Sequence, residues 1–409
     1  MTHLAPTPPR ERAVSLDILR GFAMLGVLIG NMSLYTGSFM ARGESSTADE
    51  LGHLFIQIFV DSKAQTLLCF LFGFGFAAQL LRAQARREPV LGLYLRRMLV
   101  LFAFGASHVL LLWWGDVTWT YAVAGFGLLA FQHASNRVRV IVGSIFVIVP
   151  VLVCQIPEVR DWQLGVFTTR TDLMLAFKEL GATIQNADRE GLWRSHLHIA
   201  LMWETQIWLW YFLWILGRFL LGYVAGAKRW FERDGADHLP VFRRMLWIGI
   251  VSTIAWGALL CVLHFGHVEQ PLALRFVVQA VFQLSLIGTA LGYVGAVVLA
   301  VQRPRLKRAL SIIAPAGRMP LTTYILESVI ATSICYGWGL GWNGIGPSEY
   351  IPLSLAIFAG EVALAHVWLR YFRFGPLEWL WRWGVYLERP RMWIDRSAAT
   401  SAAGSARAE

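Results

Sequence analysis

The sequence predicts an all-α fold: a polytopic membrane protein with about ten transmembrane helices. Hydrophobic residues make up 56% of the 409 residues and charged residues only 15%. The mean hydropathy is +0.52, and a soluble domain of this length does not need so much apolar surface. The 19 Trp and 25 Phe residues strengthen the prediction, because aromatic side chains favour membrane interfaces.

The first expected span lies between Arg20 and Arg42, a stretch without Asp, Glu, Lys or Arg. A spanning helix needs about 20 mostly apolar residues, which this stretch provides. It is too long for a signal-peptide core and follows Asp17 and Arg20, so we interpret it as a retained helix. Nine further spans are expected at about 54–81, 98–115, 118–133, 139–156, 201–227, 245–264, 273–301, 319–340 and 351–371.

The polar stretch 157–200 is the one loop long enough to carry structure of its own. Its segment 171–184, TDLMLAFKELGATI, has helical spacing of apolar residues and predicts an amphipathic helix lying on the membrane. The expected organisation is a tail 1–11, helices over 12–156, an outer loop 157–200, helices over 201–385, and a tail 386–409 that is mostly disordered.

Basic residues fall in alternate loops, which predicts that both termini are cytoplasmic. This segregation accounts for the net charge of +10, so we expect no nucleic-acid partner. The four cysteines lie inside apolar runs, without the spacing of a disulfide framework or of a metal site. We therefore expect no bound metal.

The apolar stretch 107–125, SHVLLLWWGDVTWTYAVAG, contains two residues that are costly to bury in a membrane, His108 and Asp116. Ionisable groups within spans are functional candidates. Asp116 follows Gly115, so it is either the cap of a tight turn into the next helix or part of a site. His108 is either a hydrogen-bonded packing residue or a general base.

Further polar residues lie near the ends of the expected spans. Arg20 shares a helix face with Asp17 and, about three turns on, with Asn31. They form either an ion pair with a packing amide or an anion-binding face. Asp61 and Lys63 are either a self-satisfied pair or site residues. More candidates are Arg318 at the cytoplasmic side and four residues within the expected spans: Arg218, Glu327, Glu361 and His366.

Five stretches together resemble the YeiB-like bacterial membrane protein family, whose defining region is called domain of unknown function 418. They are SLDILRGFAMLGVLIGNM (15–32), SKAQTLLCFLFGFGF (62–76), the stretch 107–125, GRMPLTTYILESVI (317–330) and WLRYFRFGPLEWLWR (368–382). The resemblance runs in order from about residue 12 to 385. It implies a multi-pass protein of the bacterial cytoplasmic (inner) membrane.

The LDxxRG opening of the first helix also resembles membrane acyltransferases of the heparan-glucosaminide N-acetyltransferase type. That resemblance implies transfer from cytoplasmic acyl-CoA to an acceptor across the membrane, with a histidine near the outer side. By region this histidine is His53, whereas within the YeiB-like pattern the matching histidine is His108. Both assignments stay open at this point.

Three functions fit these residues. The first is an acyltransferase with acyl-CoA as co-substrate, a hydroxyl or amine acceptor, and His108 as general base. The second is a proton-coupled transporter or exporter of a small molecule, and the third is a structural membrane subunit. Expected partners are membrane lipids and a small-molecule, lipid or sugar acceptor, with a homodimer left open. The candidate catalytic residues are His108, Asp116, Asp61, Lys63 and His53, and the candidate cofactor-binding residues are Arg20, Asn31 and Arg318.

Overall fold

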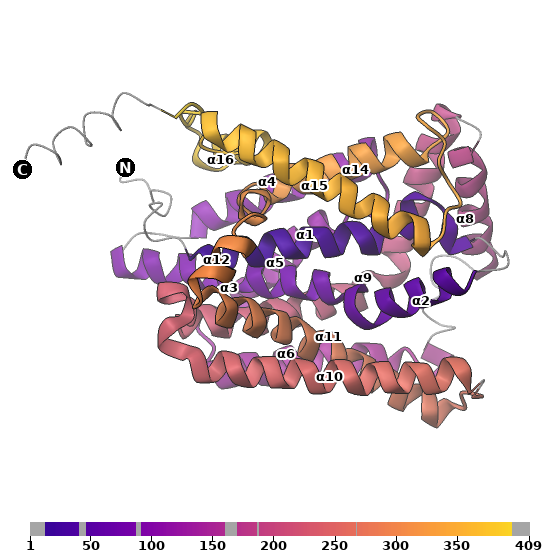
Figure 1. Cartoon of the computed structure of the whole chain (residues 1–409), viewed down its shortest axis with the longest axis horizontal. Helices are drawn as coiled ribbons and strands as arrows, with labels where there is room; N and C mark the ends of the chain where they lie inside the picture. Colours follow the sequence, from indigo (N-terminus) through magenta and orange to yellow (C-terminus); the bar gives the residue numbers. More distant parts are fainter. Residues whose placement is uncertain are drawn as a thin grey trace, which may run out of the picture.

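In the computed structural model most helices run along one common direction, horizontal in Figure 1. The structure describes residues 13–40, 46–86, 91–159, 170–185, 188–266 and 268–394, and named strands are absent from this part of the chain. The longer helices are α1 (Val14–Tyr35), α2 (Thr47–Phe55), α3 (Lys63–Arg86), α4 (Leu91–Leu111), α5 (Thr118–Leu128), α6 (Asn136–Val153), α8 (Arg170–Gln185), α9 (Arg189–Ala227), α10 (Leu239–Phe265), α11 (Leu272–Val301), α14 (Pro320–Cys335), α15 (Pro347–Tyr371) and α16 (Pro376–Tyr386). Two short helices, α12 (Pro304–Leu310) and α13 (Ala314–Arg318), precede α14.

Eight helical stretches among the described residues are long and apolar enough to cross a membrane. Two shorter apolar helices, 118–131 and 320–335, occupy the ranges of the fourth and ninth expected spans. The prediction of an all-helical, multi-pass membrane protein is therefore supported. The count of ten and the cytoplasmic termini stay predictions, and the tails 1–11 and 395–409 lie outside the described residues.

The second expected span is broken near its start, which the sequence did not predict. Helix α2 continues into a π-helical turn, η3 (Ile56–Val60), and the helix then stops at Asp61 and Ser62. Ser62 has a φ of +57°, a left-handed conformation that ends a right-handed helix. Helix α3 starts afresh at Lys63, so neighbouring side chains at the break face different parts of the protein.

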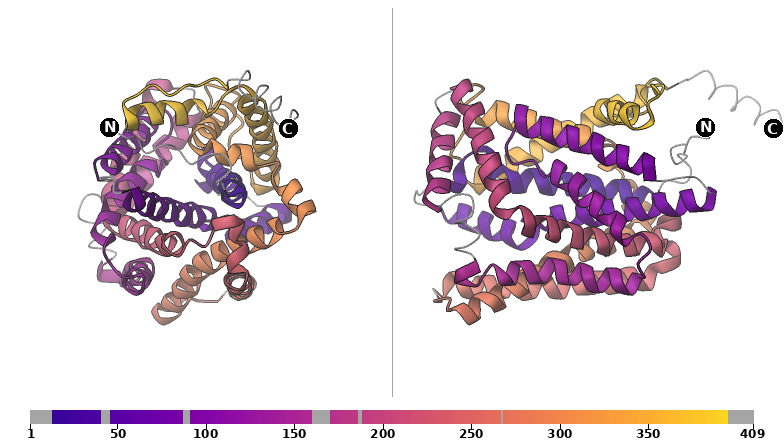
Figure 2. Two further views of the ribbon diagram at one scale, coloured as in Figure 1. Left: turned by 90° about the vertical axis from the view of Figure 1, so that its left-hand side faces the viewer. Right: turned by 180° about the vertical axis from the view of Figure 1, so that it is seen from behind.

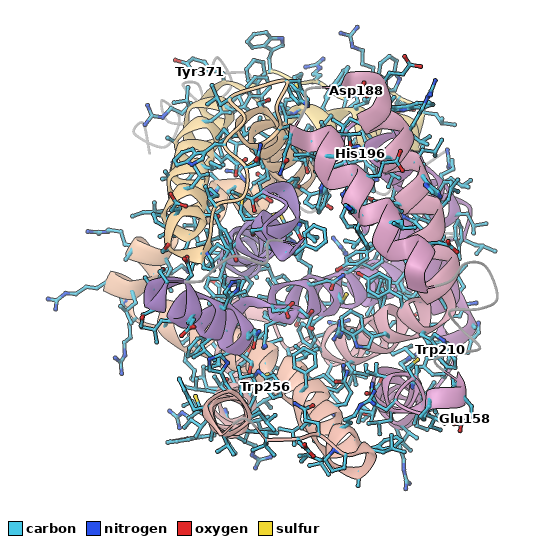
Figure 3. All side chains as sticks on the ribbon, turned by 90° about the vertical axis from the view of Figure 1, so that its right-hand side faces the viewer. Glu158, Asp188, His196, Trp210, Trp256 and Tyr371 are labelled. Atoms are coloured by element: carbon cyan, nitrogen blue, oxygen red, sulfur yellow. The ribbon has the colours of Figure 1, made fainter. Side chains whose placement is uncertain are left out.

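Helix α8 and the first part of α9 cross one end of the bundle, which we call the capped end (Figures 1 and 2). Figure 3 looks onto this end and shows the chain running from Asp188 past His196 towards Trp210. The helix predicted over 171–184 is confirmed as α8. Its residues Phe177, Leu180 and Ile184 are buried in a core cluster, so protein contacts already cover its apolar face.

Helix α1 lies inside the bundle, as the end-on view of Figure 2 shows. It contributes to two of the three buried apolar clusters. The third cluster packs α3 to α6 against α9. At the centre of that contact, an added Cβ on Gly73 would lie 1.9 Å from the Phe219 carbonyl oxygen, and one on Gly222 would lie 1.9 Å from that of Phe70. Glycine at both positions lets the two backbones touch.

Candidate functional site

A buried His–Asp pair lies where α4 turns back into α5. The His108 Nδ1 is 2.8 Å from Asp116 Oδ2, and the two residues are only 4% and 2% exposed. Helix α4 ends at Leu111, and the chain reverses direction over 112–117. The predicted Gly–Asp turn is present, and a Cβ on Gly115 would lie 2.5 Å from the Trp113 ring.

The same carboxylate begins the next helix. Asp116 Oδ1 accepts hydrogen bonds from the backbone N–H of Thr118 at 2.7 Å and of Trp119 at 3.3 Å. The Thr118 hydroxyl donates to Asp116 Oδ2 at 2.9 Å. Asp116 thus caps α5, as one sequence interpretation held, and also contacts His108. The cap fixes the carboxylate, and the carboxylate fixes the imidazole.

The second imidazole nitrogen, His108 Nε2, is buried without a hydrogen-bond partner among the described residues. A carboxylate on Nδ1 favours the tautomer that carries its proton there, which leaves Nε2 as a proton acceptor. The Tyr324 ring stands edge-on to the imidazole, with ring centroids 5.3 Å apart. This arrangement is the one that general-base catalysis by histidine requires.

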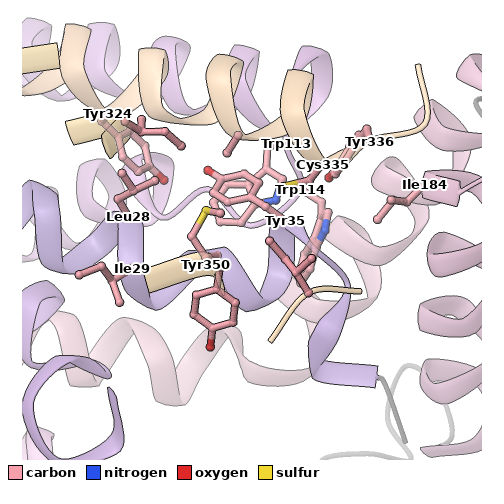
Figure 4. Close-up of a cluster of buried hydrophobic side chains, with 14 of the residues drawn as sticks. Leu28, Ile29, Tyr35, Trp113, Trp114, Ile184, Tyr324, Cys335, Tyr336 and Tyr350 are labelled. Atoms are coloured by element: carbon pink, nitrogen blue, oxygen red, sulfur yellow. The ribbon is translucent and has the colours of Figure 1, made fainter. Parts of the chain in front are cut away.

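Aromatic rings surround the pair. The Trp113 ring centroid is 6.3 Å from that of His108 and 4.3 Å from that of Tyr35. Figure 4 shows Tyr35 beside Trp113, with Trp114 adjacent and Tyr324 further along α14. The Tyr35 hydroxyl shares a hydrogen bond of 2.7 Å with Ser328. The pair therefore lies in a buried, largely aromatic region.

A cavity of about 1190 Å³ runs through the bundle beside this region. Trp114, Val117 and Tyr324 line it, whereas His108 and Asp116 do not. The imidazole is therefore one side-chain layer away from the cavity. Tyr324 both contacts the imidazole and lines the cavity, so a molecule in the cavity reaches His108 only if Tyr324 moves.

Five arginines line the cavity near the starts of α1 and α4 and the end of α3. They are Arg20, Arg82, Arg97, Arg318 and Arg382, and we call this set the basic mouth. A sixth lining arginine, Arg229, pairs with Glu232 at 3.4 Å and is not counted in this set. Arg20 also forms the expected ion pair with Asp17, at 3.0 Å. The guanidinium of Arg97 stacks over the Trp381 ring at 4.7 Å. Several guanidinium groups at one opening favour an anionic ligand such as a phosphate.

Two of the five stretches that resemble the YeiB-like family, 15–32 and 317–330, pack against each other at this mouth. A Cβ on Gly317 would lie 1.9 Å from the Asp17 carbonyl oxygen, and one on Gly21 would lie 2.5 Å from that of Ile313. The LDxxRG and GRMP stretches thus meet backbone to backbone. This contact places Arg20 and Arg318 at the same opening.

The last of the five stretches, 368–382, contributes Glu378 of α16 to the same end of the cavity. Its Oε1 accepts the backbone N–H groups of Leu321 at 2.7 Å and Thr322 at 3.1 Å, and Oε2 accepts the Thr322 hydroxyl at 2.6 Å. The carboxyl therefore satisfies the first amides of α14 from another helix. Burial raises the pKa of Glu378, and the hydrogen bonds from Thr322 and Leu321 act in the opposite direction.

The remaining predicted site residues do not gather in one place. Asn31 and Asp61 line the cavity. Lys63 is buried on the other side of the break, where its ammonium donates to the Gln57 carbonyl and lies 5.2 Å from the centroid of the Phe282 ring. His53 is exposed on α2 and does not line the cavity. The described residues contain no cluster of metal-binding side chains.

Sequence reasoning did not single out Tyr324 or Glu378 as site residues. Both lie within stretches that resemble the YeiB-like family, GRMPLTTY and FGPLEW. The resemblance therefore pointed to these segments, but not to the individual residues. Neither contact follows from local spacing. Tyr324 approaches a turn about 200 residues earlier in the chain, and Glu378 binds amides 56 and 57 residues away.

Fold and site together define a multi-pass helical membrane protein with an interior cavity and a buried His–Asp pair. Residues 225–388 match the family model described as "Protein of unknown function (DUF418)". The chain is 29% identical to the uncharacterized protein YxaH of Bacillus subtilis (strain 168), covering 95% of this chain and 97% of that protein. It is 26% identical to the uncharacterized protein YeiB of Escherichia coli (strain K12), covering 91% and 96%.

A third relative is an uncharacterized 39.9 kDa protein of Bacillus acidopullulyticus, 29% identical over 92% of this chain and 94% of that protein. No solved structure matches the chain. The chain is therefore similar to YeiB-like proteins over most of its length and matches the DUF418 model over residues 225–388. The likeness to LDxxRG acyltransferases rests on the motif alone.

Proposed function

We propose that this protein is a membrane acyltransferase that moves an acyl group from cytoplasmic acyl-CoA to a hydroxyl or amine acceptor at the outer side. The observation that carries the proposal is the His108–Asp116 pair, with its 2.8 Å contact and its open Nε2. A histidine oriented by a carboxylate is a common general base for acyl transfer. The cavity beside it supplies room for two substrates.

The reaction follows from these groups. The His108 Nε2 takes the proton of the acceptor as its oxygen or nitrogen attacks the thioester carbonyl carbon. The carbon–sulfur bond then breaks, and the imidazolium returns the proton to the departing CoA thiolate. Asp116 holds the imidazole and balances its charge throughout. Tyr324 moves aside to admit the acceptor.

Binding of the donor would use the basic mouth. Coenzyme A carries several phosphate groups, and arginine recognises phosphate with paired hydrogen bonds. Arg20 and Arg318 lie at the same opening because their glycine neighbours pack together. Asn31 and Asp61, further along the cavity, are the polar groups available to an acceptor.

The test is the release of CoA thiol from acetyl-CoA and palmitoyl-CoA by the purified protein in liposomes. Changing His108→Gln is expected to lower the rate about 10²–10⁴-fold. The matched control is His53→Gln, because His53 is exposed and outside the cavity. Full activity of His108→Gln together with an inactive His53→Gln would transfer the role to His53. Absence of both binding and turnover of acyl-CoA would end the proposal.

A proton-coupled transporter is the second candidate, and one observation favours it. Glu327 of α14 and Glu361 of α15 are 1% and 4% exposed, and they interact electrostatically. Glu327 Oε1 and both Glu361 oxygens lack a hydrogen-bond partner among the described residues. Buried carboxyls in spans commonly carry protons. Proton-driven flux in liposomes without an acyl donor, abolished by Glu327→Gln, would favour this candidate over acyl transfer.

A further inference from the structure

Arg218 of α9 is a buried cation for which no counter-charge is found in the described part of the chain. The residue is 1% exposed, and none of its three guanidinium nitrogens has a hydrogen-bond partner among the described residues. Its position is within the stretch of α9 that is apolar enough to cross a membrane. A charge kept at such a place costs folding free energy and is typically retained for function.

The surroundings of Arg218 are polar but uncharged. The guanidinium carbon lies 2.9 Å from the centroid of the Trp214 ring, and the Trp214 Nε1 donates to Gln283 Oε1 at 2.8 Å. The ionisable groups with the largest effect on Arg218 are Cys69, Tyr121 and Tyr211. All three are neutral at pH 7 in their ordinary state. The positive charge therefore lacks compensation from these neighbours.

Three neighbours of Arg218, namely Tyr121, Tyr211 and Trp214, line the cavity. Gln65, Leu68 and Phe72 line it as well, and we call the space lined by these six residues the α9 lobe. Gln65 Nε2 donates to the Tyr211 hydroxyl, and the Tyr121 hydroxyl donates to the Gln65 carbonyl at 3.3 Å. The lobe thus combines an apolar, aromatic surface with a few fixed polar groups, and Arg218 lies directly behind it.

We infer that the α9 lobe binds the anionic head, carboxylate or phosphate, of an amphipathic molecule, with Arg218 as its counter-charge. A charge acts over a longer range in a low-dielectric interior than in water, so the guanidinium attracts an anion without being exposed. Leu68 and Phe72 supply the apolar contact for the rest of the molecule. The site is distinct from the basic mouth and does not depend on acyl transfer.

The test is a thermal unfolding measurement on the full chain in a neutral maltoside detergent. The probes are octanoate, octyl phosphate, inorganic phosphate and uncharged octanamide. One or both octyl anions are expected to raise the Tm of the unaltered protein by several degrees, and octanamide is not. Arg218→Met is expected to lose this shift, while its Tm without probe stays the same or rises because an unpaired buried charge is gone. Arg244→Met is the matched control, since Arg244 is exposed on α10.

A second variant keeps the test decisive if Arg218→Met does not fold. Leu68→Trp fills the lobe and leaves the arginine in place, so it is expected to abolish the shift as well. An unchanged shift in either variant overturns the inference, as does the absence of any shift in the unaltered protein. An equal shift from inorganic phosphate alone overturns the amphipathic assignment, because a bare anion would then suffice.

Discussion

The Asp116 carboxylate is shared between the His108 imidazole, 2.8 Å away, and the first backbone amides of α5. One residue therefore orients a candidate base and starts a helix. A substitution that keeps the helix cap can therefore still remove the orientation of the base.

Asp116→Asn separates the two roles. Asparagine is as good a helix cap as aspartate, so the Tm is expected to fall by only a few degrees. The amide presents a donor where the carboxylate accepted, which disfavours the tautomer with a free Nε2. Acyl-CoA turnover is expected to fall about 10²–10⁴-fold. Thr118→Val removes only the hydroxyl contact and serves as control. Equal activity of the two variants would contradict the role of His108 as a general base oriented by Asp116.

Gly317→Ala is expected to destabilise the fold. The added Cβ would lie 1.9 Å from the Asp17 carbonyl oxygen, so α1 and α13 must separate, at a cost of about 1–3 kcal/mol. Gly360→Ala is the matched control, because an added Cβ there meets no atom within 4 Å. The measurement is the Tm of both variants in detergent, and an equal Tm would contradict the packing described for the mouth.

His196 predicts a pH dependence at the capped end. It precedes the spanning part of α9, is 5% exposed and lies 3.4 Å from the Tyr336 hydroxyl. Burial lowers the pKa of His196 to about 4, so the folded protein binds the proton less readily than the unfolded chain. Its contribution is complete above about pH 6.5 and is lost as the pH falls through about 4, amounting to about 3 kcal/mol at most.

The check is the Tm between pH 7.5 and 4.5. His196→Gln is expected to flatten the decrease, whereas His198→Gln, at an exposed position on the same helix, is expected to keep it. If both variants lose stability as steeply as the unaltered protein, other groups dominate the acid transition.

Arg20→Gln tests the basic mouth under the proposed reaction. Loss of a charge-assisted contact to a phosphate costs about 1.5–3 kcal/mol, so KM for acyl-CoA is expected to rise about 10-fold or more with little change in kcat. Arg244→Gln, exposed on α10, is the control. A change confined to kcat would instead place Arg20 in the chemistry, or in the packing of α1 through Asp17.

Hydropathy and charge predicted the helical membrane fold, and apolar spacing predicted α8 to within a residue at each end. Local reasoning also anticipated the Asp17–Arg20 pair and the cap by Asp116, since both partners lie within a few residues. It missed the separation of Asp61 from Lys63, because the left-handed Ser62 between them follows no periodic pattern.

The contacts that complete the site were beyond such reasoning for a different reason. His108 reaches Asp116 only because the chain reverses over 112–117, and Tyr324 reaches both from a distant helix. Tertiary packing decides such encounters. Apolar spacing identifies which side of a helix is buried, but not which other helix it meets.

The hydrogen bonds from the start of α14 to Glu378 can form only late in biosynthesis. The first amides of α14 gain their acceptor only when a helix near the end of the chain has been made. Before α16 is made, the first amides of α14 lack the Glu378 acceptor. The basic mouth then also lacks Arg382, the last of its five arginines. Since chains fold from the N-terminus as they are synthesised, the cavity closes as one of the last steps of assembly. A nascent chain stopped before α16 would hold every expected span and the His108–Asp116 pair, but its basic mouth would lack Glu378 and Arg382.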